Sequence, residues 1–321
     1  MPNSSSSPLL SVIIPGYNEE EVLPFLREKL DHVLGRLSVR SEVVLIDDGS
    51  RDRSAEIMRE FARQDSRYKA LLLSRNYGHQ MAITAGLDHA AGDVVVVLDA
   101  DLQDPPELIP EMLAKWKEGY QVVYGQRTTR QGDSWAKKVT AGIFYRFIRR
   151  LSGVDIPRDA GDFRLMDRKV VDALKRMPEH HRFVRGMVAW AGFRQCPIFF
   201  ERPPRKAGTT KYPWRKMFQF ALDAIFAFSV IPLRISTGIG LLIMGFSMLE
   251  ILWILYLRFI LNITVKGYSS ILIAILLLGG LNLLILGILG EYIGRIYIEA
   301  KNRPLYLVQE FVAHPSADQN S

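Results

Sequence analysis

Short apolar runs alternate with amphipathic segments through residue 124. The apolar runs predict β-strands at 10–14, 42–46, 70–73, 93–98 and 121–124. The segments between them carry apolar residues at helical spacing and predict helices at 21–37, 54–64, 79–91 and 106–118. Strands and helices that alternate at this period favour an α/β fold with a mostly parallel sheet.

Two much longer apolar segments follow, at 235–257 and 267–290. The second has no charged residue and the first has one, Glu250. A helix of about 20 apolar residues crosses the ~30 Å hydrocarbon core of a membrane. Lysine and arginine are more frequent outside the pair than in the short link between them, so the positive-inside rule places both ends of a hairpin in the cytoplasm. We therefore expect a protein of the cytoplasmic (inner) membrane with two spans and with both termini cytosolic.

The hairpin divides the chain into parts of different character. We expect a cytosolic catalytic domain at 1–210, a juxtamembrane segment with an interfacial helix at 211–234, two transmembrane helices at 235–293 and a cytosolic tail at 294–321. An amphipathic stretch at 134–150 either faces the membrane or packs as a core helix. The first ten residues, MPNSSSSPLL, lack the charged and apolar regions of a signal peptide.

The average composition hides an uneven charge. Hydrophobic residues make up 48% and the net charge is +7, which is ordinary for a basic soluble protein. Residues 127–216, however, hold 22 Lys and Arg against 8 Asp and Glu, while the remainder is net negative. A basic block directly before membrane helices indicates anionic lipid head groups or an anionic lipid substrate, and its position disfavours nucleic acid as the partner.

Several common chemistries lack their motifs. A single cysteine excludes an internal disulfide framework and a cysteine-based zinc site. The chain has neither G-x-G-x-x-G nor G-x-x-x-x-G-K-[ST], which disfavours dinucleotide oxidoreductases and P-loop NTPases, and neither G-x-S-x-G nor H-E-x-x-H. His79 and the pair at 180–181 show no metal spacing, and we expect them at the surface or hydrogen-bonded.

Polar and acidic clusters follow the predicted strands, where an α/β sheet binds its ligand. Asp99 and Asp101 flank one residue after a buried strand, and paired carboxylates suit Mg²⁺ or Mn²⁺ bound to a diphosphate, with Gln103 as a further oxygen ligand. The alternative is a solvated turn in which Asp104 caps the next helix.

The earlier strand ends suit a nucleotide. Asp48, in Asp-Asp-Gly-Ser, can accept N–H bonds from a base, or this turn can simply cap the next helix. Tyr17 can stack on a base, and Glu19 is either a ligand or a first-turn acid. Arg75 and the asparagine after it can meet ribose or phosphate.

Taken together, the motifs resemble family 2 glycosyltransferases of GT-A fold. The matching segments are SVIIPGYNEE (11–20), VVLIDDGSRDRS (43–54), LSRNYGHQMAITAGLDHAAGD (73–93), VVLDADLQDPPE (96–107), DAGDFRLMDR (159–168), RKAGTTKYPWRKM (205–217) and GEYIGRIYIEAKNRPLY (290–306). Within the family the chain is similar to bacterial polyprenyl-phosphate (undecaprenyl-phosphate) glucosyltransferases and, more distantly, to dolichyl-phosphate mannose synthase. It lacks the Q-x-x-R-W of processive synthases.

The resemblance implies a role for individual residues. The nucleotide-sugar would be bound by Pro15, Tyr17, Glu19, Asp48, Arg75 and Asp99. Asp101 and Gln103 would hold the divalent cation, and Asp99, Asp101 and Asp162 would be the catalytic acids. The lipid phosphate would be bound by Arg202, Arg205, Lys206 and Lys211.

We therefore expect inverting transfer of a hexose, glucose from UDP-glucose, to undecaprenyl or another polyprenyl phosphate. Asp162 would orient the acceptor or accept its last proton; a structural salt bridge to Arg164 or a neighbour is the alternative. The other functions to weigh are transfer of mannose, galactose or an N-acetylhexosamine, glycosylation of a hydroxyl lipid, and a membrane-tethered nucleotide-sugar binding subunit. Glycines in both apolar segments permit close helix packing, so a homo-oligomer is compatible with the sequence.

Overall fold

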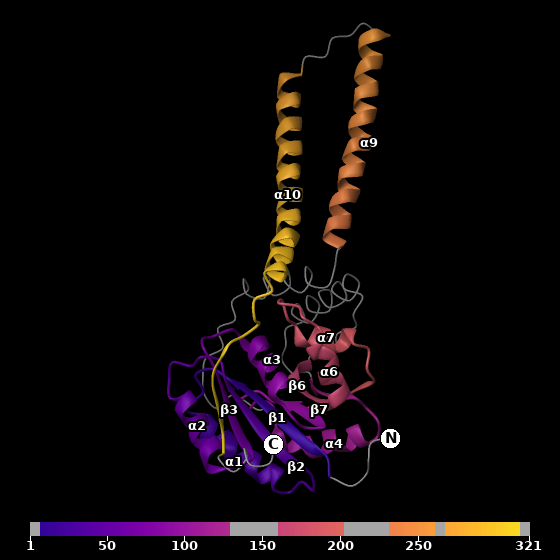
Figure 1. Ribbon diagram of the computed structural model, residues 1–321. Helices are drawn as coiled ribbons and strands as arrows, with labels where there is room; N and C mark the ends of the chain where they lie inside the picture. Colours follow the sequence, from indigo (N-terminus) through magenta and orange to yellow (C-terminus); the bar gives the residue numbers. More distant parts are fainter. Residues whose placement is uncertain (1–6, 129–159, 202–230, 261–266, 315–321) are drawn as a thin grey trace. The chain divides into compact units, whose positions relative to one another are not determined.

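The computed structural model describes residues 7–128, 160–201, 231–260 and 267–314. It forms two compact units (Figure 1). One contains the described residues up to 201 together with those from Pro304 onward, and the other contains the described residues from 231 to Arg303.

The first unit is built on a sheet in which eight strands are described. They are β1 (Leu9–Gly16), β2 (Arg40–Asp47), β3 (Tyr68–Leu73), β4 (Val94–Val97), β5 (Val122–Arg127), β6 (Ala160–Asp167), β7 (Gln195–Phe200) and β8 (Val308–Ala313), in the spatial order β7-β5-β6-β4-β1-β2-β3-β8. β6 and β8 pair antiparallel with their neighbours, and the other strand pairs are parallel. The predicted α/β fold with a mostly parallel sheet is confirmed.

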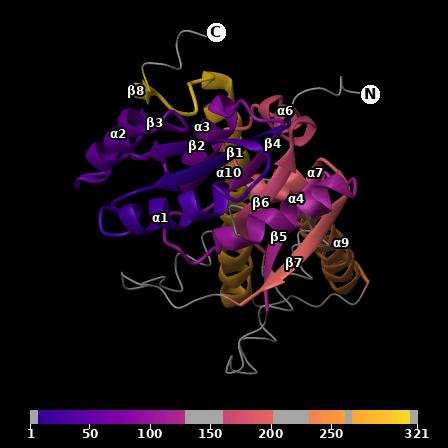
Figure 2. The same ribbon diagram turned by 90° about the horizontal axis from the view of Figure 1, so that it is seen from below.

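Helices cover both faces of this sheet (Figure 2). They are α1 (Leu23–Leu34), α2 (Ser54–Gln64), α3 (His79–His89), the 3₁₀ turn η1 (Pro106–Leu108), α4 (Ile109–Lys117), α6 (Arg168–Lys175) and α7 (Val184–Trp190). Most lie within a few residues of the predicted helices, because their apolar faces follow the helical period along the sequence.

The alternation of side chains along β1 sends them to opposite faces. Val12 and Ile14 join the core cluster that includes residues of α1, α2 and α4. Ile13 faces α3 on the other side, where a Cβ added to Gly86 would lie 2.1 Å from the Ile13 Cγ2 atom. The glycine therefore lets α3 approach β1 closely, which fixes the position of the first turn of α3 near the strand ends.

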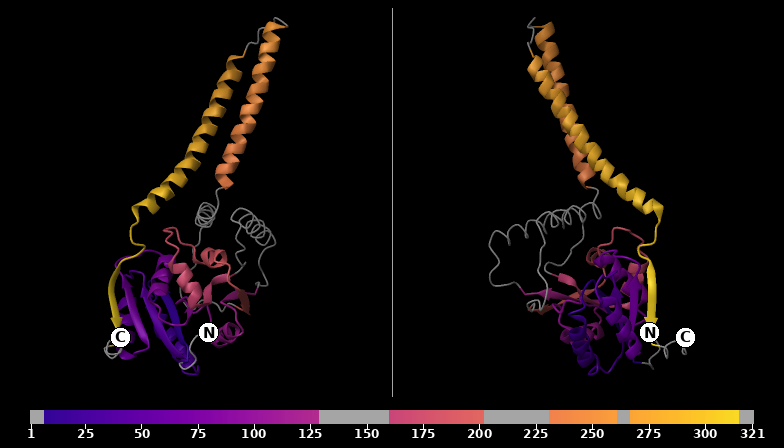
Figure 3. Two further views of the ribbon diagram at one scale, coloured as in Figure 1. Left: turned by 45° about the vertical axis from the view of Figure 1, so that its right-hand side comes forward. Right: turned by 90° about the vertical axis from the view of Figure 1, so that its left-hand side faces the viewer.

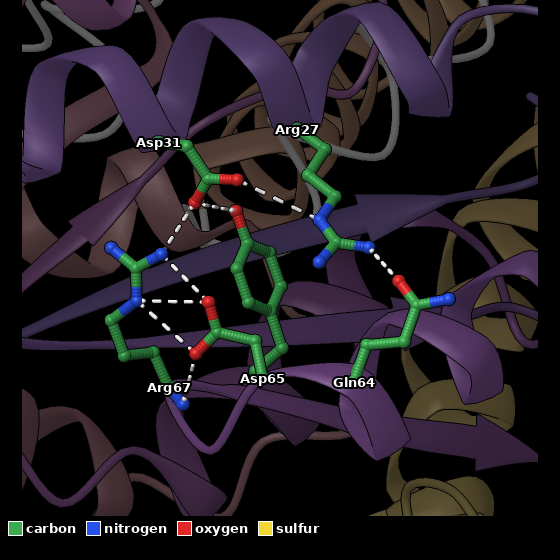
Figure 4. Close-up of polar contacts among 6 residues, drawn as sticks. Arg27, Asp31, Gln64, Asp65 and Arg67 are labelled. Atoms are coloured by element: carbon green, nitrogen blue, oxygen red, sulfur yellow. Dashed lines mark hydrogen bonds and ion pairs between the residues drawn. The ribbon is translucent and has the colours of Figure 1, made fainter.

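A polar network joins α1 to the connection between α2 and β3 (Figure 4). Asp31 accepts a hydrogen bond of 2.8 Å from Arg67 Nη2, which also pairs with Asp65 at 2.7 Å. Arg27, one turn before Asp31, donates to Gln64 at 2.6 Å. These contacts join α1 to residues that lie just before β3, at the amino end of the strand. They therefore stabilise the fold at the end of the sheet away from the motifs that follow the strands.

Three strands, β6, β7 and β8, have no counterpart among the predicted elements, and β7 pairs parallel with β5. β6 inserts antiparallel between β4 and β5. β8 lies within the segment expected as a cytosolic tail, and it pairs antiparallel with β3 at the edge of the sheet. The chain that leaves the second unit therefore returns to the sheet of the first unit.

The second unit contains α9 (Ile231–Phe259) and α10 (Tyr268–Lys301), which lie side by side (Figure 3). In the described residues one helical window, Leu277–Lys301, is long and apolar enough to cross a membrane, with a mean hydropathy of 1.7 and none of it buried. A shorter apolar stretch covers Ser236–Leu249 in α9. One candidate span is found, so the two-span hairpin is not confirmed and stays a prediction.

Some predicted features lie outside the described residues. They are the amphipathic stretch at 134–150, the basic loop at 202–211 and the interfacial helix within 211–230.

Candidate active site

The turns after β1 and β2 are joined to each other by hydrogen bonds. The Asn18 N–H donates to Ser50 Oγ at 2.9 Å, and the Asn18 side chain accepts from the Arg51 N–H at 2.8 Å. Asn18 has a φ of 57°, a left-handed conformation that asparagine tolerates better than most residues. Pro15 is the penultimate residue of β1, and Tyr17, the first residue after the strand, is 40% exposed, so its ring is accessible to a ligand.

The residues after β2 hold the turn that precedes α3. Asp48 is buried, and its two carboxylate oxygens accept hydrogen bonds from the N–H groups of Tyr77 (2.7 Å) and Gly78 (2.9 Å). Burial raises the pKa of Asp48, although these hydrogen bonds oppose the shift. Asp48 therefore positions the backbone before α3, and its contact with a nucleobase stays a prediction.

The alternative proposed for this region was helix capping, and part of it is present. Asp52 accepts from the Ser54 N–H at 3.0 Å at the start of α2, and from the Glu20 N–H at 3.2 Å. The Glu19 N–H donates to Ser54 Oγ at 2.8 Å. The backbone of Glu19 is therefore fixed against α2.

Arg75 lies in the connection between β3 and α3. Its guanidinium stacks on the ring of Tyr77, with 4.1 Å between the guanidinium carbon and the ring centroid. Arg75 is exposed, and the stacking holds its charge near the strand ends.

The segment after β4 places Asp99, Asp101 and Gln103 in one tight turn. The Gln103 N–H donates to Asp101 Oδ1 at 3.1 Å. Leu102 between them is buried and has a φ of 57°, which is strained for a bulky residue. Burial of the leucine side chain offsets the cost of this backbone conformation. The alternative in which Asp104 caps the next helix is not observed, because η1 has no side-chain cap.

Two oxygens of this turn are buried without a hydrogen bond from the described residues, Asp99 Oδ1 and Gln103 Oε1. Burial raises the pKa of Asp99, partly offset by the nearby His79. A buried oxygen without a hydrogen bond suits a cation, since unpaired polar groups are costly; Asp99 Oδ1 also lies 3.4 Å from His79 Nε2. The described residues contain no group of three or more His, Cys, Asp or Glu side chains arranged for a metal. Mg²⁺ often takes only one or two protein carboxylates and completes its shell with substrate phosphates, so the residues present fit such an ion.

Asp162 is at the centre of a second cluster. It lies in β6 with 5% of its surface exposed, and Arg185 of α7 pairs with it through Nε–Oδ1 (2.9 Å) and Nη2–Oδ2 (3.2 Å). Gln80 Nε2 donates to Oδ2 at 3.2 Å. Burial raises the pKa of this carboxyl, but the hydrogen bond from His79 and the charge of Arg185 outweigh it, so the net pKa is well below its usual range.

His79 joins the two clusters. Its Nε2 atom lies 3.4 Å from Asp99 Oδ1 and 3.3 Å from Asp162 Oδ2. Burial lowers the pKa of the imidazole, but the hydrogen bond to Asp162 and the charge of Asp99 raise it more, so the net pKa is raised. The two carboxylates predicted as catalytic from separate motifs are thus connected through one side chain.

Arg164 lies two residues after Asp162 and shares its face of β6. It is 4% exposed, and its Nη2 donates to the Gly161 carbonyl at 2.9 Å. Burial lowers the pKa of Arg164 to about 10. The direct ion pair of Asp162 is with Arg185, so the salt-bridge alternative from the sequence holds with a partner from α7.

The sequence predicted Asp162 and the strand-end acids as site residues but not His79, Gln80 or Arg185. His79 and Gln80 lie within the matching segment 73–93, but nothing in the sequence links them to Asp162 or Arg185, because β6, α3 and α7 meet only in the folded sheet. The predicted lipid-phosphate residues Arg202, Arg205, Lys206 and Lys211 lie outside the described residues.

Comparisons with known proteins identify the family of the chain. A family model described as "Glycosyl transferase family 2" matches residues 11–175. The chain is 50% identical over 300 residues to the "Uncharacterized glycosyltransferase YkcC" of Bacillus subtilis, which covers 94% of this chain and 93% of that one. It is 40% identical over 301 residues to the "SfII prophage-derived bactoprenol glucosyl transferase" of Shigella flexneri, covering 94% and 97%.

Among solved structures, the glucosyl-3-phosphoglycerate synthase of Mycobacterium tuberculosis in complex with Mn²⁺, uridine diphosphate and glucosyl-3-phosphoglycerate is 18% identical. The match covers 68% of this chain and 78% of that one, with a TM-score of 0.46.

Proposed function

The chain belongs to glycosyl transferase family 2, and from this premise we propose that it transfers glucose from UDP-glucose to a polyprenyl phosphate. The observation that carries the proposal is the 40% identity, over 94% of the chain, to a bactoprenol glucosyl transferase. The similarity covers the apolar helices α9 and α10 as well as the region that precedes them. Because it is not confined to the region proposed to bind the nucleotide, it supports an acceptor of the same class.

The donor would bind across the ends of β1, β2 and β4. Tyr17 is exposed for stacking on the base, Asp48 lies at the end of β2, and Arg75 offers a fixed positive charge to phosphate or ribose. Pro15 and Glu19 would shape the turn after β1. UDP as the nucleotide rests on the family resemblance, and a guanine nucleotide is the outcome to test against it.

A divalent cation, Mg²⁺ or Mn²⁺, would be held by Asp101 and Gln103 with Asp99 beside them. The buried oxygens Asp99 Oδ1 and Gln103 Oε1 support this assignment. Bound there with the donor, the cation would offset the negative charge that develops on the departing nucleoside diphosphate.

The acceptor phosphate needs little help from a base. Its second pKa is about 6, so at cytosolic pH it is largely a dianion and can attack the anomeric carbon directly. Asp162 has a low pKa and accepts hydrogen bonds from Arg185 and Gln80, which suits a carboxylate that positions its neighbours. A single displacement inverts the anomeric carbon.

The apolar helices would hold the domain at the cytoplasmic face of the membrane, where a polyprenyl phosphate is presented. α9 has 29 residues, or about 43 Å at ~1.5 Å per residue, which is long enough to span. The basic residues Arg202, Arg205, Lys206 and Lys211 would contact the lipid phosphate from the loop before α9.

The proposal is tested with full-length protein, undecaprenyl phosphate and a panel of UDP- and GDP-sugars, followed by mass spectrometry of the lipid. We expect a single hexose on the phosphate, with UDP-glucose as the preferred donor. Undecaprenol is the matched control and should stay unmodified. Transfer to the alcohol or to diacylglycerol, or donor binding without transfer, would contradict the proposal.

A further inference from the structure

The buried carboxylate of Asp162 holds donors that are themselves partly exposed. Arg185 and His79 have side chains that are 31% and 44% exposed, whereas the side chain of Asp162 is 5% exposed. Arg185 contacts it at two points, Nε–Oδ1 (2.9 Å) and Nη2–Oδ2 (3.2 Å). A buried acid with exposed cationic partners orients those partners and does not itself face a ligand.

An anion that arrives at this cluster meets the donors first. A phosphate dianion is repelled by the carboxylate of Asp162 and attracted to the guanidinium of Arg185, with which it can form charge-assisted hydrogen bonds. Arg164, buried two residues along β6, adds a second positive charge. Arg185, Arg164 and His79 therefore lie around the carboxylates of Asp162 and Asp99, and the side chains of Arg185 and His79 are more exposed than either carboxylate.

The position of the cluster separates it from the nucleotide side. β6 is next to β4, on the side of β4 away from β1 and β2. The Asp99–Gln103 turn ends β4, so it lies between the nucleotide-side turns and the Asp162 cluster. A displacement needs its incoming and departing groups on opposite sides of the reacting carbon, and this order provides the two sides.

We propose that Arg185 and His79, oriented by Asp162, bind the phosphate of the acceptor. Gln80 completes the arrangement, since its Oε1 atom accepts the Val184 N–H (2.9 Å) while its Nε2 atom donates to Asp162 (3.2 Å). This contact fixes the first turn of α3 to the start of α7, so the two phosphate-binding side chains keep a constant separation. The inference rests on the proposed function for the identity of the acceptor.

The test compares binding and kinetics of the full-length protein and its variants. Arg185→Gln should weaken binding of a short-chain prenyl monophosphate by about tenfold to a hundredfold, as expected for loss of a charge-assisted contact. Binding of the prenyl alcohol and the KM for UDP-glucose should stay unchanged. Arg194→Gln is the matched control, because Arg194 stacks on Tyr120 and lies outside the cluster.

Removing Arg185 also leaves a buried acid without its ion pair, so a second variant isolates the binding role. Asp162→Asn combined with Arg185→Gln removes both charges. If Arg185 only stabilises Asp162, the double variant should recover prenyl phosphate binding, and that recovery would overturn the inference. If Arg185 binds the phosphate, binding stays weak in the double variant and is partly retained in Arg185→Lys.

The other source of phosphate is the donor. A rise in the KM for UDP-glucose in Arg185→Gln, with prenyl phosphate binding unchanged, would assign the residue to the nucleotide diphosphate and overturn the acceptor assignment. Wild-type protein that binds prenyl phosphate through Arg185 but transfers no sugar to it would refute the proposed function and leave this inference standing.

Discussion

The hydroxyl of Tyr306 donates a hydrogen bond of 2.8 Å to the carboxylate of Asp88, near the end of α3. The next residue, Leu307, accepts the Ser74 N–H at 2.9 Å, directly before the turn that carries Arg75. β8 then pairs with β3, and Glu310 forms an ion pair of 2.9 Å with Arg59. The segment after α10 is therefore part of the sheet that carries the active site.

We predict that a chain ending at residue 303 is less stable than one ending at residue 314. The shorter chain loses the β8 hydrogen bonds and the Glu310 ion pair, an expected cost of about 3 kcal/mol or more, and it exposes the edge of β3 to aggregation. The measurement is thermal unfolding of both proteins in detergent. Tyr306→Phe should cost about 1 kcal/mol. Equal melting temperatures for the two truncations would show that β8 does not stabilise the domain.

The glycine after Asp48 offers a test of how the strand-end turns pack. Gly49 has a φ of +68°, and an added Cβ would lie 2.4 Å from the Arg75 carbonyl carbon. Gly49→Ala should therefore displace the turn before α3, lower stability by about 2 kcal/mol or more and raise the KM for the nucleotide-sugar.

Gly119→Ala is the control for backbone strain alone. Gly119 has a φ of +97° with nothing within 4 Å of an added Cβ. It should lose about 1 kcal/mol without a change in KM. If both variants show the same loss of stability and the same KM, the close packing of Gly49 against Arg75 does not affect nucleotide-sugar binding.

A divalent cation at the Asp99–Gln103 turn predicts a graded response to substitution. Asp101→Asn should lower kcat by about a hundredfold. Gln103→Leu, which keeps the size but removes Oε1, should raise the Mn²⁺ concentration for half-maximal activity by about tenfold. Electron paramagnetic resonance of Mn²⁺ in the presence of UDP measures the loss of Mn²⁺ affinity directly, without catalytic turnover.

Glu107→Gln is the control for the cation site, since Glu107 is a nearby acid whose side chain is 53% exposed. It should leave the Mn²⁺ dependence unchanged. Full activity of the wild-type protein in excess chelator would argue against a cation at this turn.

Glu42 gives a pH prediction that is separate from the active site. Its side chain is 7% exposed and contacts Lys69 Nζ at 2.7 Å, and it accepts hydrogen bonds from Ser11 and from the Ala91 N–H. Burial raises the pKa of Glu42, but these hydrogen bonds and the Lys69 charge outweigh it and lower the net pKa. The stabilisation is thus complete above the unfolded pKa of about 4.3 and is lost as the pH falls below it.

Urea unfolding between pH 7 and about pH 2 measures this effect, because the stabilisation is lost below the unfolded pKa. Glu42→Gln should lose about 1–3 kcal/mol at pH 7 and show a shallower decrease in stability with falling pH than the wild type. Glu118→Gln removes an exposed partner of Lys115 and should leave stability and its pH dependence nearly unchanged, because solvent screens this ion pair. An unchanged slope in Glu42→Gln would assign the acid sensitivity to other carboxylates.

The first five strands and the helices between them were predictable because their signals are local. Val94–Val97 is a short apolar run, and the apolar residues of α1 recur with the helical period. The strand-end motifs were predictable for the same reason, since parallel strands bring their carboxyl ends to one edge. The family followed from several such motifs in order.

The second half of the domain was harder. The segment of β6 carries Asp162, Phe163 and Arg164, in which charged and apolar residues alternate, and its antiparallel place between β4 and β5 has no local signature. β8 was expected as part of a tail because six residues near a chain end carry little periodic signal.

The sequence by itself determined the α/β pattern, the acidic turns at the strand ends and two long apolar segments, since each depends on residues close together in the chain. Only the tertiary structure decided that Arg185 pairs with Asp162, that His79 lies between Asp99 and Asp162, and that β8 closes the edge of β3. These contacts join segments up to hundreds of residues apart. The order of the strands depends on the free energy of the whole sheet, and the periodicity of a single segment does not determine it.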